Sequence, residues 1–256
     1  MRNRLIGAAL GAVLGLAVLP GAASAAGDGP QPPEREWSFN GIFGTFDRAA
    51  LQRGYQVYRE VCAACHSMRL LYYRNLMQIG LSEAAAKVEA ANAFIVDGPD
   101  SEGEMFERPG KLSDRFVSPF PNDNAAKAAN GGALPPDLSL MAKNQAGGPD
   151  YIAAVLTGYA DPPEGMEMSD TQSYNMYYSG HRIAMPPPLS DDLVEYADGT
   201  PATVDQMAVD VSHFLMFAAE PQLEDRHRLG VKVIIFLLVL TGILYALKRK
   251  VWSAVH

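Results

Sequence analysis

Two cysteines and a histidine stand within five residues of one another in the first third of the chain. Cys62 and Cys65 are the only cysteines, and His66 directly follows the second. This Cys-Ala-Ala-Cys-His pattern is that of covalent haem attachment: each thiol adds to a haem vinyl group, and the imidazole binds the iron. A redox dithiol of this spacing is typical of a βαβ context, and a zinc site needs further Cys or His ligands. The sequence offers neither, so it predicts one haem c held by Cys62, Cys65 and His66.

The other face of the iron needs a second axial ligand, for which Met or His is the usual donor. Met185 is favoured because three prolines stiffen the loop 183–189 in which it lies. Met68 is too close to the histidine to reach the far face, and Met207 and Met216 lie on a helix, Met207 on its packing stripe. The alternatives that remain open are Met141, Met166, Met168, Met176 and His181. A His/Met pair closes both axial positions, which suits electron transfer rather than oxygen or peroxide chemistry.

The elements that must position these residues are predicted to be mainly α-helical. Residues 47–66 have the apolar spacing of an amphipathic helix with the haem motif at its C-terminal end. Asp47 or Thr45 can cap its start, and Gly54 inside it indicates close packing against another helix. Further helices are predicted at 81–93, 150–158 and 203–218, the first with Ser82 as N-cap and the last with Thr203 and Gln206 in a capping-box pattern. The segments 97–150 and 160–202 are rich in Gly, Pro, Asp and Asn, and they predict long loops around the haem.

The two ends of the chain predict export and a membrane anchor. Residues 1–26 have the basic start, apolar run and small-residue cleavage site of a signal peptide, with a retained anchor as the alternative. Residues 229–247 form an apolar stretch close to the ~20 residues that span a bilayer. The basic residues that follow predict a cytoplasmic tail at 248–256. Between these ends lie a lead-in segment at 27–36 and one extracytoplasmic domain at 37–222.

Composition and charge limit the classes of function. The chain has 256 residues, is 48% hydrophobic and carries a net charge of −8. This predicts a folded core and argues against nucleic-acid binding, because phosphate binding requires an excess of Lys and Arg. Acidic residues gather in three sets: Asp97, Asp100, Glu102, Glu104 and Glu107; Asp161, Glu164, Glu167 and Asp170; Asp191, Asp192 and Glu195. Each set is either a docking surface for a basic partner or an ordinary solvated loop.

Four stretches together resemble the cytochrome c1 family, the haem-bearing subunits of the quinol–cytochrome c oxidoreductase (complex III). They are residues 54–66; residues 130–139, which read NGGALPPDLS; residues 184–187 with 198–203; and residues 218–221 leading into the apolar C-terminal stretch. Many haem proteins share the Cys-x-x-Cys-His pattern. Its combination with Pro-Pro-Asp-Leu-Ser, Met-Pro-Pro and a single C-terminal anchor is far more specific.

The resemblance implies a class I cytochrome c-like haem domain with Met185 as the sixth ligand. It implies that the Pro136 carbonyl accepts a hydrogen bond from His66, which fixes the imidazole tautomer and raises its basicity. It also implies that Tyr151 lies near the haem. The implied role is to take one electron from the Rieske iron–sulfur protein and pass it to cytochrome c, as a subunit of a dimeric complex with cytochrome b. The implied location is the bacterial inner membrane, with the haem domain in the periplasm.

Two departures from the family pattern concern how the haem and Met185 are held. Gln145, two residues after Lys143, stands where members often carry a basic residue near the haem propionates. Some bacterial relatives have an extra disulfide that clamps the methionine-bearing region, which a chain with two cysteines cannot form. Loop packing and three tyrosines are therefore expected to hold Met185 instead: Tyr174, Tyr177 and Tyr178.

Two other functions compete with the electron-relay subunit. A haem enzyme would have several haems or an open axial site, whereas this chain has one attachment motif and a good methionine candidate. A free-standing, membrane-anchored cytochrome c shuttle would have a smaller domain. Here 119 positions separate His66 from Met185, and the long loops between them suit an interaction surface.

Overall fold

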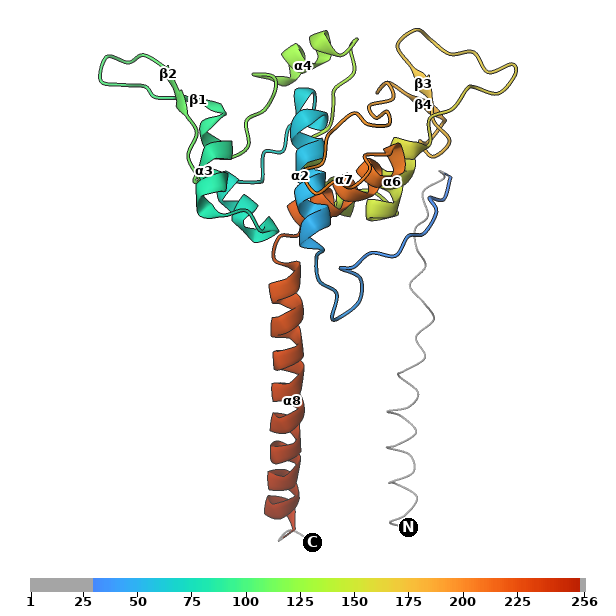
Figure 1. Ribbon diagram of the computed structural model, residues 1–256. Helices are drawn as coiled ribbons and strands as arrows, with labels where there is room; N and C mark the ends of the chain where they lie inside the picture. Colours follow the sequence, from blue (N-terminus) through green and yellow to red (C-terminus); the bar gives the residue numbers. More distant parts are fainter. Residues whose placement is uncertain (1–29, 254–256) are drawn as a thin grey trace.

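Helices dominate the part of the chain that the structure describes, residues 30–253 of the computed structural model. Figure 1 shows a helical domain from which one long C-terminal helix leaves. The sheets in these described residues are two short antiparallel hairpins. The expected fold class, a mainly α haem domain with long loops and one C-terminal transmembrane helix, is therefore confirmed. The signal peptide expected at 1–26 lies outside the described residues.

The centre of the domain is a pair of packed helices, α2 (Arg48–Glu60) and α7 (Val204–Ala219). A Cβ atom at Gly54 of α2 would lie only 2.0 Å from the Asp210 carbonyl oxygen of α7, so glycine is required for this approach. The Asp210 side chain is fully buried and receives two hydrogen bonds from the Arg53 guanidinium, at 2.8 and 2.9 Å. The close packing expected at Gly54 is confirmed.

Helix α2 begins where the sequence predicts and ends earlier. The Asp47 carboxylate caps it by accepting from the backbone of Ala49 and Ala50. The regular helix ends at Glu60, and a 3₁₀ turn, η1 (Cys62–Ala64), follows. The expectation of one helix from 47 to 66 was therefore wrong at its C-terminal end. The backbone tightens there because the Cys65 amide donates to the Cys62 carbonyl, three residues earlier, at 3.1 Å.

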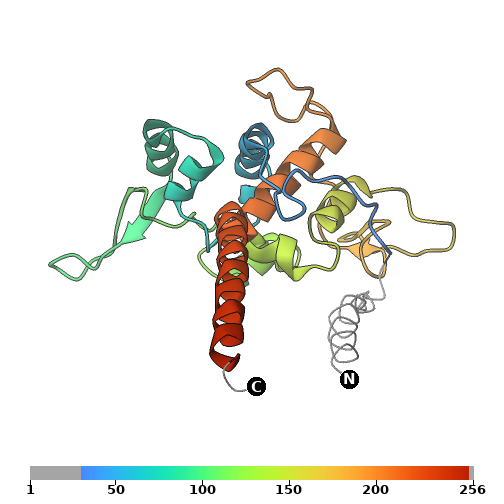
Figure 2. The same cartoon turned by 90° about the horizontal axis from the view of Figure 1, so that it is seen from below.

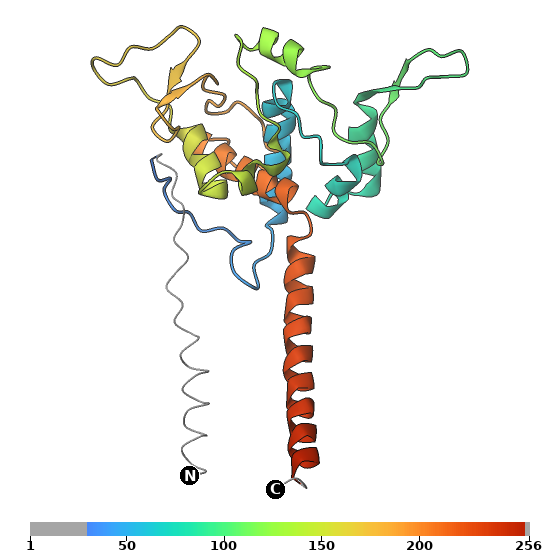
Figure 3. The ribbon, with the colours of Figure 1, turned by 180° about the vertical axis from the view of Figure 1, so that it is seen from behind.

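The other expected helices are present with small shifts. They are α3 (Glu83–Ala91), capped by Ser82, α6 (Gly148–Thr157) and α7, capped by Thr203. Several short elements were not expected: η2 (Tyr73–Ile79), α4 (Asp123–Ala129), η3 (Leu138–Leu140) and α5 (Met141–Asn144). The hairpins are β1 (Phe94–Asp97) with β2 (Phe106–Pro109), and β3 (Ser173–Tyr174) with β4 (Arg182–Ile183). Seen from behind in Figure 3, the two hairpins project on opposite sides of the helical centre.

The segment before α2, residues 37–46, packs against α6 and α7. The Trp37 indole nitrogen donates to the Asp150 carboxylate of α6 at 2.7 Å. Trp37 and Phe39 pack edge-on against His213 of α7, with ring centroids 4.9 and 5.4 Å apart. Phe46 packs against Phe217 in the same way. This aromatic cluster extends the core around the end of α7.

The last helix, α8 (Leu223–Trp252), is 30 residues long, or roughly 45 Å at 1.5 Å per residue. Its most apolar stretch has a mean hydropathy of 2.4, and its side chains there face outward from the protein. Such an uncovered apolar helix is a transmembrane anchor. The helix includes the expected span 229–247 and continues through residues 248–252, which were expected to form a tail.

Candidate haem site

The two thiols lie at the turn that follows α2. Cys62 is half-buried and Cys65 is exposed, and both are free thiols in the protein alone. Burial, with the nearby Cys65 second, raises the pKa of the Cys62 thiol to about 12. The turn is closed by the amides of Cys65 and His66, which both donate to the Cys62 carbonyl. The sulfurs therefore stand three residues apart on a backbone that a core helix holds in place.

His66 is fixed by a contact across seventy residues. Its ring nitrogen Nδ1 lies 2.8 Å from the Pro136 carbonyl oxygen, the contact that the family resemblance implied. The carbonyl can only accept, so Nδ1 carries the proton and Nε2 keeps its lone pair. Burial lowers the pKa of His66, and the hydrogen bond to Pro136 acts in the opposite direction. A neutral imidazole with a free Nε2 is the form that binds a metal.

The backbone beside His66 is joined to the residues after Pro136 by a ladder of hydrogen bonds. The Asp137 carboxylate accepts from the Ser67 hydroxyl and the Arg69 amide at 2.8 and 2.9 Å. The Leu138 amide donates to the Ser67 carbonyl at 2.8 Å, and the Ser139 hydroxyl accepts from the Leu70 amide at 3.0 Å. The Pro-Pro-Asp-Leu-Ser stretch thus holds the histidine segment through several independent bonds.

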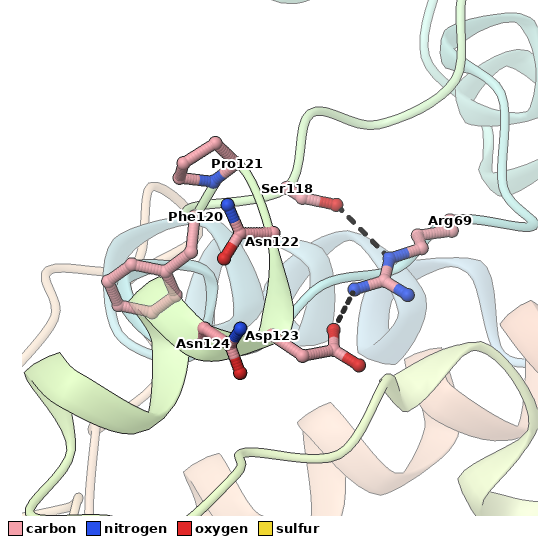
Figure 4. Close-up of a pocket in the computed structure, with 7 residues that line it drawn as sticks. All are labelled: Arg69, Ser118, Phe120, Pro121, Asn122, Asp123 and Asn124. Carbon is pink, nitrogen blue, oxygen red and sulfur yellow. Dashed lines mark hydrogen bonds and ion pairs between the residues drawn. The ribbon is translucent and has the colours of Figure 1, made fainter.

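The exposed Cys65 borders a small hollow with mixed walls, in which Ser67, Arg69, Ser118 and Asn122 are the polar residues. Phe120, Ala126, Leu134 and Pro135 line it together with Cys65. A second, open hollow continues from it, and Figure 4 shows the Arg69 guanidinium there between Ser118 and Asp123, at 3.4 Å from each. These residues carry no signal in the sequence, because only the fold brings 118–126 beside 65–69.

Met185 lies on the segment that leaves the β3–β4 hairpin. Its side chain is half-buried, between the buried Ile183 and the exposed Pro186 and Pro187. The Tyr159 hydroxyl, just past the end of α6, donates to the Met185 carbonyl at 3.1 Å. The prolines and this bond fix the Met185 backbone. They do not involve the thioether sulfur, which can therefore bind a ligand.

The hairpin before Met185 is organised by Asn175, which is fully buried. Its side-chain NH₂ donates to the Val155 carbonyl of α6 at 2.7 Å. Its side-chain oxygen accepts from the amides of Tyr177 and Tyr178 at 3.0 and 3.2 Å. The Asn175 amide donates to the His181 carbonyl at 3.0 Å, which closes the turn. Asn175 therefore holds the hairpin before Met185, a role that was expected of the neighbouring tyrosines. Among the described residues, these tyrosines form no hydrogen bond to Met185.

The remaining candidate residues near the proposed haem lie in different surroundings. Tyr151 lies in α6, and burial together with the neighbouring Tyr178 raises its pKa. The His181 ring stacks on Tyr174 at 5.5 Å, and its Nδ1 contacts the Asn175 carbonyl at 3.1 Å. Met141 and Met166 are half-buried, as is Met168, whereas Met176 is exposed. Lys143, which precedes Gln145 near α5, pairs with Glu220 at 3.5 Å.

The donor set fits a covalently bound haem. It offers two free thiols at the required spacing, a histidine with a free Nε2, and a methionine on a fixed loop. The thiols and the histidine follow α2, whereas the Met185 backbone is bonded to Tyr159 just past α6, and both helices pack on α7. Such a set can hold an iron porphyrin with both axial positions filled by protein.

Comparison with known proteins places the chain in a family. A model of the Cytochrome C1 family matches residues 37–255. The chain is 50% identical over 251 residues to cytochrome c1 of Rhodospirillum rubrum, covering 92% of each protein. It is 48% identical to cytochrome b/c1 of Bradyrhizobium diazoefficiens, covering 88% of this chain and 36% of that longer protein. It is also 48% identical to the mitochondrial cytochrome b-c1 complex catalytic subunit of Candida albicans, over 91% of this chain and 82% of that protein. The chain belongs to the cytochrome c1 family.

Proposed function

We propose that this protein is the electron-transfer subunit of a quinol–cytochrome c oxidoreductase. In this proposal it accepts one electron from the Rieske iron–sulfur protein on a single haem c and passes it to cytochrome c. The hydrogen bond of His66 to the Pro136 carbonyl is the observation that carries the proposal, and the Tyr159 bond to the Met185 backbone supports the second ligand. Cys62 and Cys65 would hold the haem through two thioethers, with His66 and Met185 as the iron ligands. The bound haem supplies reversible one-electron exchange at its iron.

In this proposal the chain's own residues would fill both axial positions of the iron. Pro136 keeps the proton of His66 on Nδ1, which leaves the Nε2 lone pair free to bind the iron, and the bonds to Asp137 hold the imidazole segment in place. Tyr159 and the prolines fix the Met185 backbone, which lowers the entropy cost of presenting the sulfur. A site closed on both faces excludes oxygen and peroxide from the iron. Tyr151, on α6, is proposed to border the haem edge.

The membrane arrangement follows from α8. Its C-terminal end carries Lys248, Arg249 and Lys250, and basic residues mark the cytoplasmic side of a membrane. The proposed location is therefore the bacterial inner membrane, with the domain at 37–222 in the periplasm. The proposed boundaries are a signal peptide at 1–26, a lead-in at 27–36, a span at 229–247 and a tail at 248–256.

The proposed complex partner is cytochrome b, within a dimeric assembly that also contains the Rieske protein. Support comes from the names of two relatives, one called cytochrome b/c1 and one called a cytochrome b-c1 complex catalytic subunit. The test is purification of the full chain in mild detergent. Recovery with a cytochrome b and an iron–sulfur protein in constant ratio is expected. Recovery of the chain alone, still able to reduce cytochrome c, would instead favour the free-standing, membrane-anchored shuttle.

The proposed docking surface for cytochrome c is the acidic loop 161–170. Asp161, Glu164, Glu167 and Asp170 are exposed and form no ion pair among the described residues. The two other acidic sets are partly engaged: Asp97 pairs with Arg108, and Asp191 accepts from the Val204 amide. An unpaired acidic surface attracts a basic partner and loses that attraction as salt rises.

Charge-neutral variants test this surface. The triple change Asp161→Asn, Glu164→Gln and Glu167→Gln in the complex is expected to slow electron transfer to cytochrome c at low salt and to flatten its salt dependence. The matched control neutralises Asp100, Glu102 and Glu104 on the other hairpin. If the two triple changes slow electron transfer equally, the effect comes from net charge in general and the loop 161–170 is not the docking surface.

The axial assignment has a direct test in Met185→Leu. Loss of the thioether is expected to lower the midpoint potential and to change the reduced spectrum, because a His/Met pair raises the potential. If both stay unchanged, one of the other methionines or His181 is the ligand.

A further inference from the structure

Ile42 and Phe43 are the two most exposed large apolar side chains among the described residues, at 69% and 77% of their full exposure. They form the tip of the loop 38–45, which precedes α2. Turn tips are usually occupied by Gly, Pro, Asn, Asp or Ser, because these residues suit the backbone and the solvent. Two large apolar side chains at such a tip indicate a surface that is covered in the working protein.

The loop is rigid and its base is buried. The Gly44 amide donates to the Gly41 carbonyl at 3.2 Å, which places Ile42 and Phe43 at the two central positions of a tight turn. Outside this turn the Thr45 amide donates to the Ser38 carbonyl at 3.0 Å. On either side of the tip, Phe39 and Phe46 are buried in the aromatic cluster on α7. The tip therefore cannot fold back to hide its apolar side chains.

The loop is fixed against the first turns of the membrane anchor. The His227 ring lies 3.3 Å from the Gly44 carbonyl, and Glu224 accepts from the Phe46 amide at 2.8 Å. The apolar run of α8 begins at Leu229, two residues and roughly 3 Å further along the helix axis. Figures 1 and 3 show the loop as the lowest part of the domain, on the side from which α8 leaves. Viewed from below in Figure 2, it lies beside the start of α8.

We infer that Ile42 and Phe43 insert into the headgroup region of the bilayer that α8 crosses. The occupant of this surface is lipid, because the tip continues the apolar surface of the anchor at the depth where the bilayer begins. On the same turns of α8, Arg226 pairs with Glu220 and Arg228 with Glu224, and both arginine side chains are still more than half exposed, so they can also reach phosphate groups of that region. A single helix leaves the domain free to rotate about it. A second membrane contact restricts that rotation and fixes how the haem site faces the membrane.

The test uses a spin label attached at Phe43→Cys in the full, haem-loaded chain. The label is examined in vesicles of phosphatidylethanolamine and phosphatidylglycerol and in the purified complex in the same lipids. Power saturation compares collisions with oxygen, which concentrates in lipid, and with a water-soluble nickel chelate. Leu238→Cys on the exposed apolar face of α8 is the lipid reference. Met105→Cys, an exposed apolar residue on the distant β1–β2 hairpin, is the water reference, and the unsubstituted chain reports labelling of its own cysteines.

The expected oxygen-to-chelate ratio at position 43 lies between the two references, below Leu238→Cys at the middle of the span and well above Met105→Cys, in vesicles and in the complex. A ratio equal to the Met105→Cys value would show a tip in water and overturn the inference. Suppression of both collision rates in the complex would show that a partner protein covers the tip, which also overturns it. A second variant, Ile42→Ser with Phe43→Ser, keeps the turn and is expected to increase the rotational mobility of the domain in vesicles.

Discussion

The Tyr159 hydroxyl donates a hydrogen bond to the Met185 carbonyl, which joins the end of α6 to the methionine segment. The bond acts on the backbone, so it determines where the methionine side chain starts and leaves the sulfur free. Tyr159 is itself held, because it forms a β-bridge with Asn175 and stands two residues after the last residue of α6. Without a disulfide in this region, these contacts carry the support of the proposed sixth ligand.

Tyr159→Phe isolates this bond, because it keeps the ring and removes the hydroxyl. One such hydrogen bond contributes about 0.5–1.5 kcal/mol, which shifts the balance toward methionine-free haem by roughly two- to twelvefold. The expected result is a weaker methionine-to-iron absorption band in the oxidised protein and faster carbon monoxide binding in the reduced protein. Tyr177→Phe removes a hydroxyl from the same hairpin and is the control. Equal results for the two variants would refute the role of Tyr159.

Asn175 is the residue on which the whole hairpin depends. Asn175→Ala leaves the Val155 carbonyl and the amides of Tyr177 and Tyr178 without their partner, at about 1–3 kcal/mol for each buried group left unpaired. The expected results are rapid proteolysis within 160–182 and a lowered midpoint potential. Asn175→Asp keeps the acceptor for the two amides but sets a carboxylate oxygen against the Val155 carbonyl.

The two Asn175 variants separate the contacts. If the bond to α6 fixes the hairpin, Asn175→Asp is as damaging as Asn175→Ala. If only the turn matters, Asn175→Asp resembles the unsubstituted protein. Asn92→Ala, at an exposed position after α3, is the control for removing an asparagine. A normal potential in Asn175→Ala would contradict the proposed role.

The helical framework could be predicted from sequence where local signals and burial agree. Helix α7 has Thr203 as its cap and a buried stripe that includes Met207 and Phe214, so its limits were expected within one residue. The end of α2 could not be predicted, because the apolar spacing continues through Cys62 and Cys65. Only the main-chain bonds to the Cys62 carbonyl show that the helix has given way to a tighter turn.

The support of the site was harder to predict than its donors. Cys62, Cys65 and His66 have a fixed spacing, and the prolines draw attention to Met185. The Pro136 contact came from family resemblance alone. Asn175 has no local signal, since an asparagine in a polar loop usually faces solvent, and its burial depends on an α6 carbonyl twenty residues away. A pair such as Tyr159 and Met185 exists only once the hairpin has docked.

At Gly54 the backbones of α2 and α7 approach so closely that there is no room for a side chain. Gly54→Ala would place a methyl group 2.0 Å from the Asp210 carbonyl oxygen and 2.9 Å from the Phe214 Cβ, so the helices must separate. Overpacking of this kind costs about 1–3 kcal/mol or more. The expected result is unfolding at a lower urea concentration. Circular dichroism and haem absorption monitor the transition. Gly230→Ala, whose Cβ would meet nothing within 4 Å, is the control and should leave the midpoint unchanged or raise it.

The buried His213 is expected to make the protein less stable in acid. It is buried against Trp37 and Phe39, and burial lowers its pKa, while its bond to the Val209 carbonyl and the charges of Asp210 and Asp47 act in the opposite direction. The unfolded chain therefore binds a proton at a higher pH than the folded one, from about pH 6.5 downward. The free energy of unfolding therefore has its highest value above that pH. It decreases as the pH falls toward the pKa of His213 in the folded protein.

The variant His213→Phe removes this titration and keeps an aromatic ring in the cluster. Urea unfolding of the haem-loaded protein from pH 8 to pH 5 should show a smaller decrease in stability for the variant than for the unsubstituted protein. Acid loss of the axial ligands affects both proteins equally, so the difference between the two curves reports His213. Parallel curves would mean that the buried ring is not the group that takes up the proton on unfolding.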